Sequence, residues 1–261
     1  MDLGLRDTVA LVTGAARGIG RRIALTLADE AVDVAVNDLD RDGVERVADE
    51  VRARGRRALA LVTDITDPAA VDQMVADAVR ELDRVDVLVN NAGVVTERLF
   101  AESERKEWER EIDVGLYGTL HVTRAVVPHM LRRKSGRIVS IASDSARSGQ
   151  ARISVYAAAK AAIVAFSKSL AQEVGPEGIT VNVVCPGSTN TDMRKAREAA
   201  VLAKVGPEKY AERQRKVLQA YPLRRVGEPE DIANMVVFLV SSRAAWVTGQ
   251  VISVNGGYTM M

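Results

Sequence analysis

Short runs rich in valine, isoleucine and leucine alternate with longer amphipathic stretches, and this alternation limits the possible folds more than any other feature. The runs are continuously apolar, as is typical of strands buried on both faces of a parallel sheet. Repeated β-α-β units predict an α/β fold, a doubly wound parallel sheet of about seven strands with helices on both faces. The predicted strands are residues 8–13, 32–38, 57–63, 85–90, 136–142, 179–185 and 250–255.

One segment, residues 188–227, departs from the alternation and is a charged, helical-looking insertion. We therefore expect a single domain over residues 1–261, in which this insertion covers the substrate. The insertion carries a basic run with two possible interpretations. It is either a solvated helix face or a binding surface for an anionic substrate tail, such as a carboxylate or the phosphates of an acyl-CoA. The run comprises Arg194, Lys195, Arg197, Lys204 and Lys209.

The charge balance narrows the possible partners. Lysine and arginine number 36 and aspartate and glutamate 35, so the net charge is +1, which argues against nucleic acid or an anionic membrane as the main partner. Cys185 is the only cysteine, so no internal disulfide is possible and a reducing compartment is indicated. No segment approaches the roughly 18 uncharged apolar residues of a membrane span. We expect a cytoplasmic protein.

A glycine-rich turn follows the first predicted strand, in the segment TGAARGIG at residues 13–20. Gly14, Gly18 and Gly20 fall on the turn and the first turn of the next helix. Glycines at such a place let the backbone approach a pyrophosphate, which the helix N-terminus stabilises. The spacing is G-x-x-x-G-x-G, and its position between a strand and a helix favours nucleotide binding over a structural turn.

The second predicted strand ends in a carboxylate, Asp38. A carboxylate there accepts hydrogen bonds from the adenosine ribose hydroxyls and repels a 2′-phosphate, which favours NAD over NADP. Arg17 is the opposing indication, because a base in the glycine turn can bind a 2′-phosphate. The alternative for Asp38 is a solvated acid at a strand end.

A candidate catalytic pair lies in the segment SVYAAAKAAIVAFSKSL. Tyr156 and Lys160 are four residues apart and share one helix face. A lysine ammonium beside a phenol favours the phenolate, so we expect a lowered Tyr156 pKa and proton exchange with a substrate hydroxyl or carbonyl. Ser143, at the end of a predicted strand, can hold the same oxygen, and Ser140 and Ser145 are competing candidates.

Taken together, these motifs resemble the short-chain dehydrogenase/reductase family over nearly the whole chain. The matching segments are TGAARGIG, Asp64-Ile65, NNAG (90–93), Ser143, YAAAK (156–160), PGSTNT (186–191) and GQVISVNGG (249–257). The resemblance implies a Rossmann-type fold that binds NAD. The residues it implies at the cofactor are Gly14, Arg17, Gly18, Ile19, Gly20, Asp38, Leu39, Asp64, Ile65, Asn91, Gly93, Tyr156, Lys160, Pro186, Gly187, Thr189 and Thr191.

The resemblance also implies a reaction, the NAD-dependent interconversion of a secondary alcohol and a ketone. The substrate is expected to be a small molecule, such as a cyclic or acyl-CoA-linked hydroxy compound. Tyr156 is the expected acid/base, Lys160 its electrostatic partner and Ser143 the oxygen anchor, with no metal. A homotetramer is expected, as in relatives. The alternative is a non-catalytic NAD-binding redox sensor or scaffold of the same fold.

Gly115 is the clearest departure from the family pattern. Family members have an asparagine within I-x-x-N-L-x-G, where this chain reads Ile112-Asp113-Val114-Gly115-Leu116-Tyr117-Gly118. The amide that helps complete a proton relay in relatives is therefore absent. The stretch around it, residues 107–131, is expected to be helical from end to end, with Gly118 packed against a neighbouring helix. Trp108 and Trp246 are expected to be packing residues.

Overall fold

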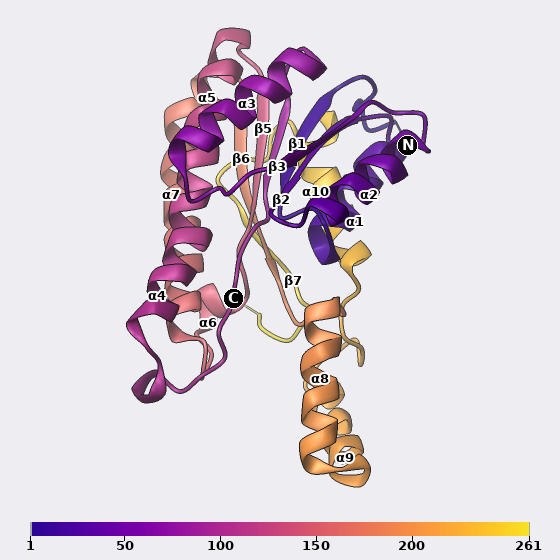
Figure 1. Ribbon diagram of the computed structural model, residues 1–261, viewed down its shortest axis with the longest axis vertical. Coiled ribbons are helices and arrows are strands. Elements are labelled where there is room, and N and C mark those ends of the chain that lie inside the picture. Colours follow the sequence, from indigo (N-terminus) through magenta and orange to yellow (C-terminus); the bar gives the residue numbers. More distant parts are fainter. Residues whose placement is uncertain (1, 261) are drawn as a thin grey trace.

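A computed structural model describes residues 2–260 of the chain. Its centre is a seven-stranded sheet in the order β3-β2-β1-β4-β5-β6-β7, in which every neighbouring pair is parallel (Figure 1). The predicted α/β fold with a doubly wound sheet is confirmed, and each predicted strand is present within two residues of its expected bounds. The strands are β1 Val9–Thr13, β2 Asp33–Asp38, β3 Ala58–Val62, β4 Val87–Asn90, β5 Gly136–Ile141, β6 Ile179–Pro186 and β7 Val251–Val254.

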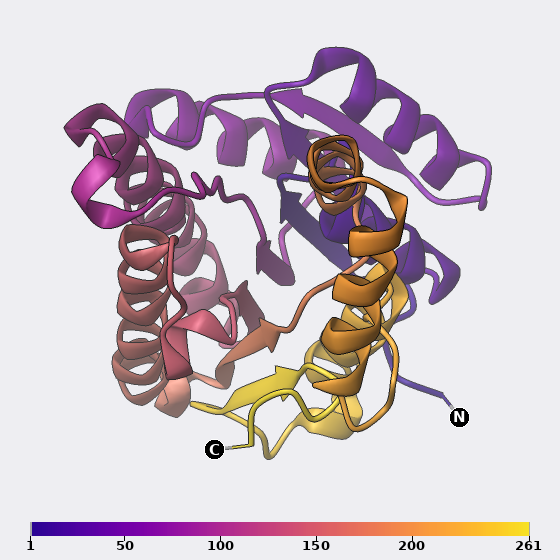
Figure 2. The ribbon, with the colours of Figure 1, turned by 90° about the horizontal axis from the view of Figure 1, so that it is seen from below.

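Helices cover both faces of the sheet (Figures 1 and 2). One face packs against α1 (Gly18–Asp29), α2 (Arg41–Arg52) and α10 (Pro229–Val240), and the other against α3 (Pro68–Leu82), α5 (Gly118–Arg133) and α7 (Ser154–Val174). Because strand side chains alternate, β1 contributes Val12 to the first core and Leu11 to the second. The sheet thus separates two hydrophobic cores and holds its strand ends rigidly.

Several helices begin at strong capping residues. Asp40 accepts a hydrogen bond from Gly43 N at the start of α2, and Asp67 accepts from the Ala69 and Ala70 amides at the start of α3. These caps satisfy amides that the first helical turn leaves unpaired.

The predicted continuous helix over residues 107–131 is wrong in detail. The segment consists of α4 (Arg105–Ile112), a π-helical turn at Asp113–Tyr117 and α5. The Gly115 carbonyl accepts a hydrogen bond from Thr119 Oγ1 at 3.0 Å. A glycine lowers helix propensity, which is consistent with the helix changing its hydrogen-bond pattern there.

Gly118 packs on a loop residue and not on a neighbouring helix. A β-carbon at Gly118 would lie 2.5 Å from Ile65 Cδ1, in the segment between β3 and α3. The expectation of tight packing is therefore correct, and its partner is different.

The insertion forms a helical hairpin of α8 (Asp192–Val205) and α9 (Pro207–Gln219), which projects beyond the end of the sheet (Figure 1). Glu198 is the buried residue of α8, and it accepts hydrogen bonds from Arg213 at 2.7 Å and Gln214 at 2.5 Å. An ion-paired contact thus links the two helices.

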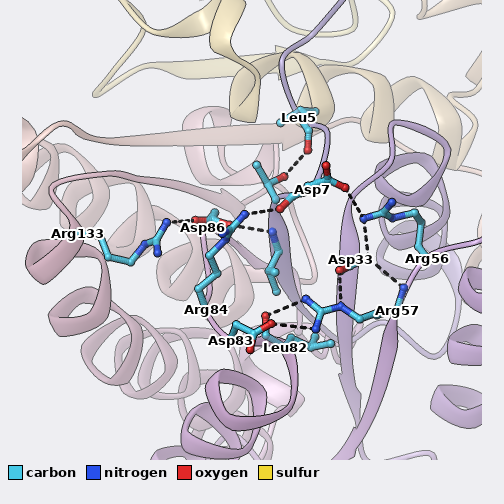
Figure 3. A network of polar contacts seen from close by, with 12 residues as sticks. Leu5, Asp7, Asp33, Arg56, Arg57, Leu82, Asp83, Arg84, Asp86 and Arg133 are labelled. Atoms are coloured by element: carbon cyan, nitrogen blue, oxygen red, sulfur yellow. Dashed lines mark hydrogen bonds and ion pairs between the residues drawn. The ribbon is translucent and has the colours of Figure 1, made fainter.

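The opposite end of the sheet carries a polar concavity of about 430 Å³, lined by Asp7, Asp33, Gly55, Arg56, Arg57, Leu82, Asp83 and Arg84. Its charges pair with one another (Figure 3). Asp33 is buried and accepts from Arg57 Nε at 2.7 Å and from the Arg57 amide at 2.9 Å, and it pairs with Arg56 at 2.9 Å. Burial raises the pKa of Asp33, but its bonds to Arg57 and the charges of both arginines outweigh it and hold the pKa below 3.8.

The two tryptophans have opposite environments. Trp108 stacks on Phe100 with ring centroids 5.2 Å apart and donates to Ser103 Oγ at 2.7 Å, as expected of a packing residue. Trp246 is fully exposed in the single chain, so its expected packing role is wrong within this chain. Within residues 2–260, no helix is both long and apolar enough to cross a membrane.

Candidate functional site

The carboxyl ends of the parallel strands meet at one edge of the sheet, and the predicted site residues gather there. The strand-end residues and those that follow directly are Thr13-Gly14 at β1, Asp38 at β2, Asp64 after β3, Asn91 after β4, Ser143 after β5, and Pro186-Gly187 at β6. Tyr156 and Lys160 reach this edge from α7. The α8–α9 hairpin extends from the same edge (Figure 2).

The turn after β1 is built so that only glycine fits at two of its positions. Gly14 has φ +63° and its β-carbon would lie 2.8 Å from Ala92 Cα. A β-carbon at Gly20 would lie 2.2 Å from the Gly14 carbonyl oxygen. Asn91 Nδ2 donates to the carbonyls of Thr13 at 3.0 Å and Gly14 at 2.9 Å. The Asn91 side chain therefore clamps the turn.

The turn leads into α1 with a helix N-terminus open to an anion. Arg17 is the exposed N-cap residue, and among residues 2–260 no side chain caps the first amides of α1. Gly18 follows with φ +56°, and the methyl group of Thr191 would lie 3.4 Å from a β-carbon there. Ile19 is half-buried and packs against the first core. Uncapped amides and an absent side chain are the features that fit a pyrophosphate.

Asp38 lies beside this turn. Its Oδ2 accepts from Ala16 N at 3.2 Å, and its Oδ1 accepts from Leu39 N at 2.8 Å. These bonds fix the carboxylate between the glycine turn and the end of β2. Leu39 is 65% exposed, so its side chain is open to contact with a ligand.

Asp64 and Ile65 have different surroundings. Asp64 is exposed, and its Oδ1 accepts from the amide and hydroxyl of Thr66 at 2.9 and 2.8 Å. Ile65 is buried against Gly118, and its carbonyl lies 3.1 Å from His121 Nδ1. Ile65 thus contributes to the core and, through its backbone, to the edge of the site.

Lys160 is buried directly beneath the site. Its Nζ donates to the Ile141 carbonyl at 2.8 Å and lies 5.9 Å from the centre of the Tyr156 ring. A β-carbon at Gly93 would lie 3.2 Å from this Nζ. Gly93 therefore leaves room for the ammonium group between β4 and α7.

The pKa of Tyr156 differs from the sequence-based expectation. Burial raises it to about 12, and a hydrogen bond with Ser143 opposes this rise, whereas Cys185 and Glu111 add to it. Burial also lowers the pKa of Lys160 to about 8. The expected net lowering by Lys160 is therefore wrong for this structure, because desolvation dominates and the Lys160 ammonium is directed at the Ile141 carbonyl.

Ser143 is the serine that faces Tyr156. Its Oγ accepts hydrogen bonds from Ser145 N at 3.2 Å and Ser145 Oγ at 2.9 Å. Ser140 lies inside β5, opposite Asn90 of β4 and Val183 of β6, and is buried. Of the three candidates, Ser143 is the one whose hydrogen bonding lowers the pKa of Tyr156, and Ser145 contacts Ser143.

The segment after β6 closes the edge of the site. The Pro186 carbonyl accepts from Asp144 N at 3.1 Å, which ties β6 to the Ser143 segment. A β-carbon at Gly187 would lie 2.9 Å from Asn255 Cα, so the chain passes close to the end of β7. Thr189 Oγ1 donates to the Gly187 carbonyl, and Thr191 caps α8 by accepting from Arg194 N. The two threonines thus hold the start of the hairpin over the glycine turn.

Sequence reasoning missed one buried acid, Glu111, which is only 4% exposed. Its Oε1 accepts from Thr96 N at 2.5 Å, and its charge helps raise the pKa of Tyr156. In the sequence, Glu111 lies in the charged segment EWEREID, a pattern typical of an exposed helix surface. The only sequence signal of its burial near the site is its position four residues before Gly115. Within residues 2–260, no group of three or more histidine, cysteine, aspartate or glutamate side chains is arranged to hold a metal ion.

Known proteins resemble this chain over almost its whole length. A family model described as "Enoyl-(Acyl carrier protein) reductase" matches residues 14–259. The chain is 41% identical over 258 residues to (2S)-[(R)-hydroxy(phenyl)methyl]succinyl-CoA dehydrogenase subunit BbsD of Thauera aromatica, covering 99% of each chain. It is 38% identical over 263 residues to the 3-oxoacyl-[acyl-carrier-protein] reductase FabG of Escherichia coli, covering 99% of this chain and 100% of that one.

The fold also matches a solved structure. A crystal structure of a putative short-chain alcohol dehydrogenase from Sinorhizobium meliloti superimposes with a TM-score of 0.89 at 32% sequence identity. The match covers 99% of this chain and 98% of that one.

Proposed function

The chain belongs to the short-chain dehydrogenase/reductase family, and on that basis we propose that it is an NAD-dependent alcohol dehydrogenase or ketone reductase in which Tyr156 transfers the proton. Membership of the family makes it an oxidoreductase that interconverts a secondary alcohol and a ketone with a nicotinamide cofactor. The observation that carries the proposal is the grouping of Ser143, Tyr156 and Lys160 beside the glycine turn.

The three side chains have separate tasks in the proposed reaction. In alcohol oxidation the Tyr156 phenolate accepts the carbinol proton, and in ketone reduction the phenol returns it to the carbonyl oxygen. Ser143 donates a hydrogen bond to the same oxygen and stabilises its negative charge. Lys160, when protonated, favours the phenolate electrostatically. The cofactor, when bound, supplies the hydride acceptor or donor.

The proposed cofactor-binding roles are those that the family resemblance implies. Gly14, Gly18 and Gly20 would bind the pyrophosphate together with the amides at the start of α1, where no side chain of the described residues caps them, and Arg17 and Ile19 would flank it. The adenosine end would contact Asp38, Leu39, Asp64 and Ile65. The nicotinamide end would contact Asn91, Gly93, Tyr156, Lys160, Pro186, Gly187, Thr189 and Thr191.

The first test is turnover, followed by nicotinamide absorbance with acetoacetyl-CoA, cyclohexanone and cyclohexanol as probes. Oxidation or reduction of the cofactor with any probe supports an enzyme. Binding of NAD without turnover of any probe would favour the second candidate, a non-catalytic redox sensor or scaffold. The missing amide at Gly115 is the observation that favours this second candidate.

NAD is favoured over NADP because Asp38 places a fixed negative charge beside the glycine turn. Repulsion of the 2′-phosphate is expected to give NAD at least about a tenfold advantage in kcat/KM, or about 1.4 kcal/mol. Asp38→Asn keeps the shape of the side chain and should narrow this difference. Equal efficiency of the natural chain with both cofactors would contradict the proposal and point to Arg17.

Acyl thioesters are the proposed substrate class, because the names of two relatives specify acyl-carrier-protein and CoA substrates. The basic insertion supplies cations near the site, although acids already engage some of them. Arg197 binds Glu97 at 2.8 and 3.0 Å, and Lys195 lies 3.8 Å from Asp192. A higher kcat/KM for acetoacetyl-CoA than for cyclohexanone would support this class, and the reverse order would count against it.

A homotetramer is the proposed assembly. Phe238 lies on α10 and is 42% exposed, and Trp246 lies just after this helix and is fully exposed. Burial of exposed aromatic residues is a common source of association energy. Light scattering at micromolar concentration should give the mass of four chains. A monomeric mass would contradict the proposal.

A further inference from the structure

We propose that Ser145 is a positioning residue for the reaction, which donates two hydrogen bonds to Ser143 Oγ and so directs the Ser143 hydroxyl proton toward the substrate oxygen. This inference rests on the proposed roles of Ser143 and Tyr156. It assigns a task to a serine that the family resemblance leaves without one.

The contacts between the two serines fix one hydrogen bond to Ser143 Oγ and allow a second. Ser145 N donates to Ser143 Oγ at 3.2 Å, and Ser145 Oγ donates to it at 2.9 Å. A hydroxyl group has one proton and two acceptor lone pairs. In the proposed arrangement the Ser145 amide and hydroxyl occupy both lone pairs, which leaves the Ser143 proton for a third partner.

The neighbouring phenol is the group with which Ser143 shares the substrate oxygen in the proposed reaction. The hydrogen bond between Ser143 and Tyr156 lowers the pKa of Tyr156, as donation to a phenolate does.

A fixed donor is what the reaction needs at this place. Negative charge grows on the substrate oxygen as hydride adds to the carbonyl carbon, and a donor already aimed at that oxygen stabilises it without reorganising. A serine with free lone pairs could instead turn its proton toward other acceptors. Ser145 removes those alternatives by occupying the lone pairs.

The position of Ser145 is itself held firmly. Ser145 is 4% exposed, so little water competes for its hydroxyl, and it begins the short helix α6 (Ser145–Ser148). Asp144, just before it, donates through its amide to the Pro186 carbonyl at 3.1 Å and accepts from Asn255 Nδ2 at 2.6 Å. Strands β6 and β7 thus anchor the segment that carries both serines.

The simpler explanation is a local turn, in which a serine oxygen accepts the amide two residues later. That turn needs only the Ser145 amide, which alanine also has. Ser145→Ala therefore removes the second hydrogen bond and leaves the turn intact.

The test measures reduction of acetoacetyl-CoA by NADH in the full-length protein, or of cyclohexanone where that probe turns over faster. Ser145→Ala should lower kcat about tenfold, as the loss of one hydrogen bond in the transition state does. KM for the probe and the affinity for NADH, measured by fluorescence titration, should change less than about twofold. Ser145→Cys nearly keeps the side-chain volume but has a weaker donor, so its kcat should lie between those of the natural chain and of Ser145→Ala.

Ser148→Ala is the matched control, because the Ser148 hydroxyl lies on the same helix and binds only the Asp144 and Gly149 carbonyls among the contacts recorded for residues 2–260. It should leave kcat unchanged. An unchanged kcat in Ser145→Ala, or an equal loss in Ser148→Ala, would overturn the inference.

A double-mutant cycle separates positioning from general damage to the fold. In a Ser143→Ala background, Ser145→Ala should lower kcat less than about twofold, because its target is gone. An equal loss in both backgrounds overturns the inference while leaving the proposed function intact. Full activity of Ser143→Ala alone would instead overturn the proposed role of Ser143, and the inference with it.

Discussion

The two ends of the sheet use polar residues in opposite ways. At the amino ends of the strands, Arg56 and Arg57 both pair with Asp33 beside an open concavity (Figure 3). At the carboxyl ends, Lys160 is buried and donates to the Ile141 carbonyl, and burial moves two nearly equal pKa values apart, lowering that of Lys160 to about 8 and raising that of Tyr156 to about 12. Mutual neutralisation is typical of a structural network, whereas perturbed pKa values in a cleft are typical of a reactive site.

This difference teaches where to look for function in this molecule. The concavity at the amino end has charges that are already satisfied by neighbouring side chains. Substitutions at the amino end should therefore change the free energy of unfolding, and substitutions at the carboxyl end should mainly change turnover.

Tyr156→Phe is expected to give the largest effect. It keeps the ring and removes the transferable proton, so kcat should fall by at least about 10²-fold, or about 2.7 kcal/mol of barrier. NAD affinity and the melting temperature should hardly change. Steady-state kinetics measure kcat, and a fluorescence titration measures the affinity for NAD. Retention of most of the activity would show that another group transfers the proton.

Asp33→Ala should give the opposite result. The change leaves the Arg57 guanidinium and amide without their shared acceptor, so the free energy of unfolding should fall by about 2 kcal/mol, measured by urea denaturation. The pKa of Asp33 is lowered in the folded chain, so its contribution is present at neutral pH and is lost as pH falls below 3.8. A large loss of kcat with unchanged stability would break the comparison between the two ends.

The pH dependence of stability sharpens the comparison at the carboxyl end. The pKa of Lys160 falls from 10.5 to about 8 on folding, so between these values the unfolded chain binds more protons and stability rises with pH. From pH 7 to about pH 9 this group should add about 1.4 kcal/mol. Lys160→Met should lack this increment when both proteins are unfolded with urea at each pH. Parallel curves for the two proteins would show that Lys160 is not desolvated as the structure indicates.

Gly115→Asn is expected to have the smallest effect. A β-carbon at Gly115 would lie 3.7 Å from Ala159 Cβ, which is an ordinary contact, so the substitution should be tolerated. The change in kcat should stay within about tenfold, or 1.4 kcal/mol. A much larger gain would mean that the natural chain is catalytically impaired, and would favour the sensor alternative.

The sequence predicted the architecture because the relevant signals are local. An apolar run such as TVALVT predicts a buried strand without knowledge of which strands it pairs with. The glycine turn likewise requires small residues at a fixed spacing within one short segment. Asp38 was placed beside that turn because both lie at the carboxyl ends of adjacent parallel strands.

Features that depend on distant partners were missed or misjudged. The ion pairs of Asp33 with Arg56 and Arg57 join segments 23 and more residues apart, and neither motif nor period marks them. Burial of Glu111 depends on the loop that carries Thr96. The direction of the Tyr156 pKa was wrong because desolvation depends on everything packed around the ring, whereas the sequence indicated only the nearby lysine.

The hydrogen bond between Asn255 and Asp144 has a consequence for how the protein is made. These partners are 111 residues apart in the chain, so the segment that carries Ser143 is synthesised well before its anchor on the last strand. At about 5–20 residues per second, the interval is roughly 5–20 seconds. Strands β1 to β4 are complete by then, so the nucleotide-binding half should resist protease in stalled nascent chains before the catalytic segment does. Simultaneous protection of both halves would contradict this order. In the proposed function, the turn that binds the cofactor would therefore form before the segment that carries Ser143 is anchored.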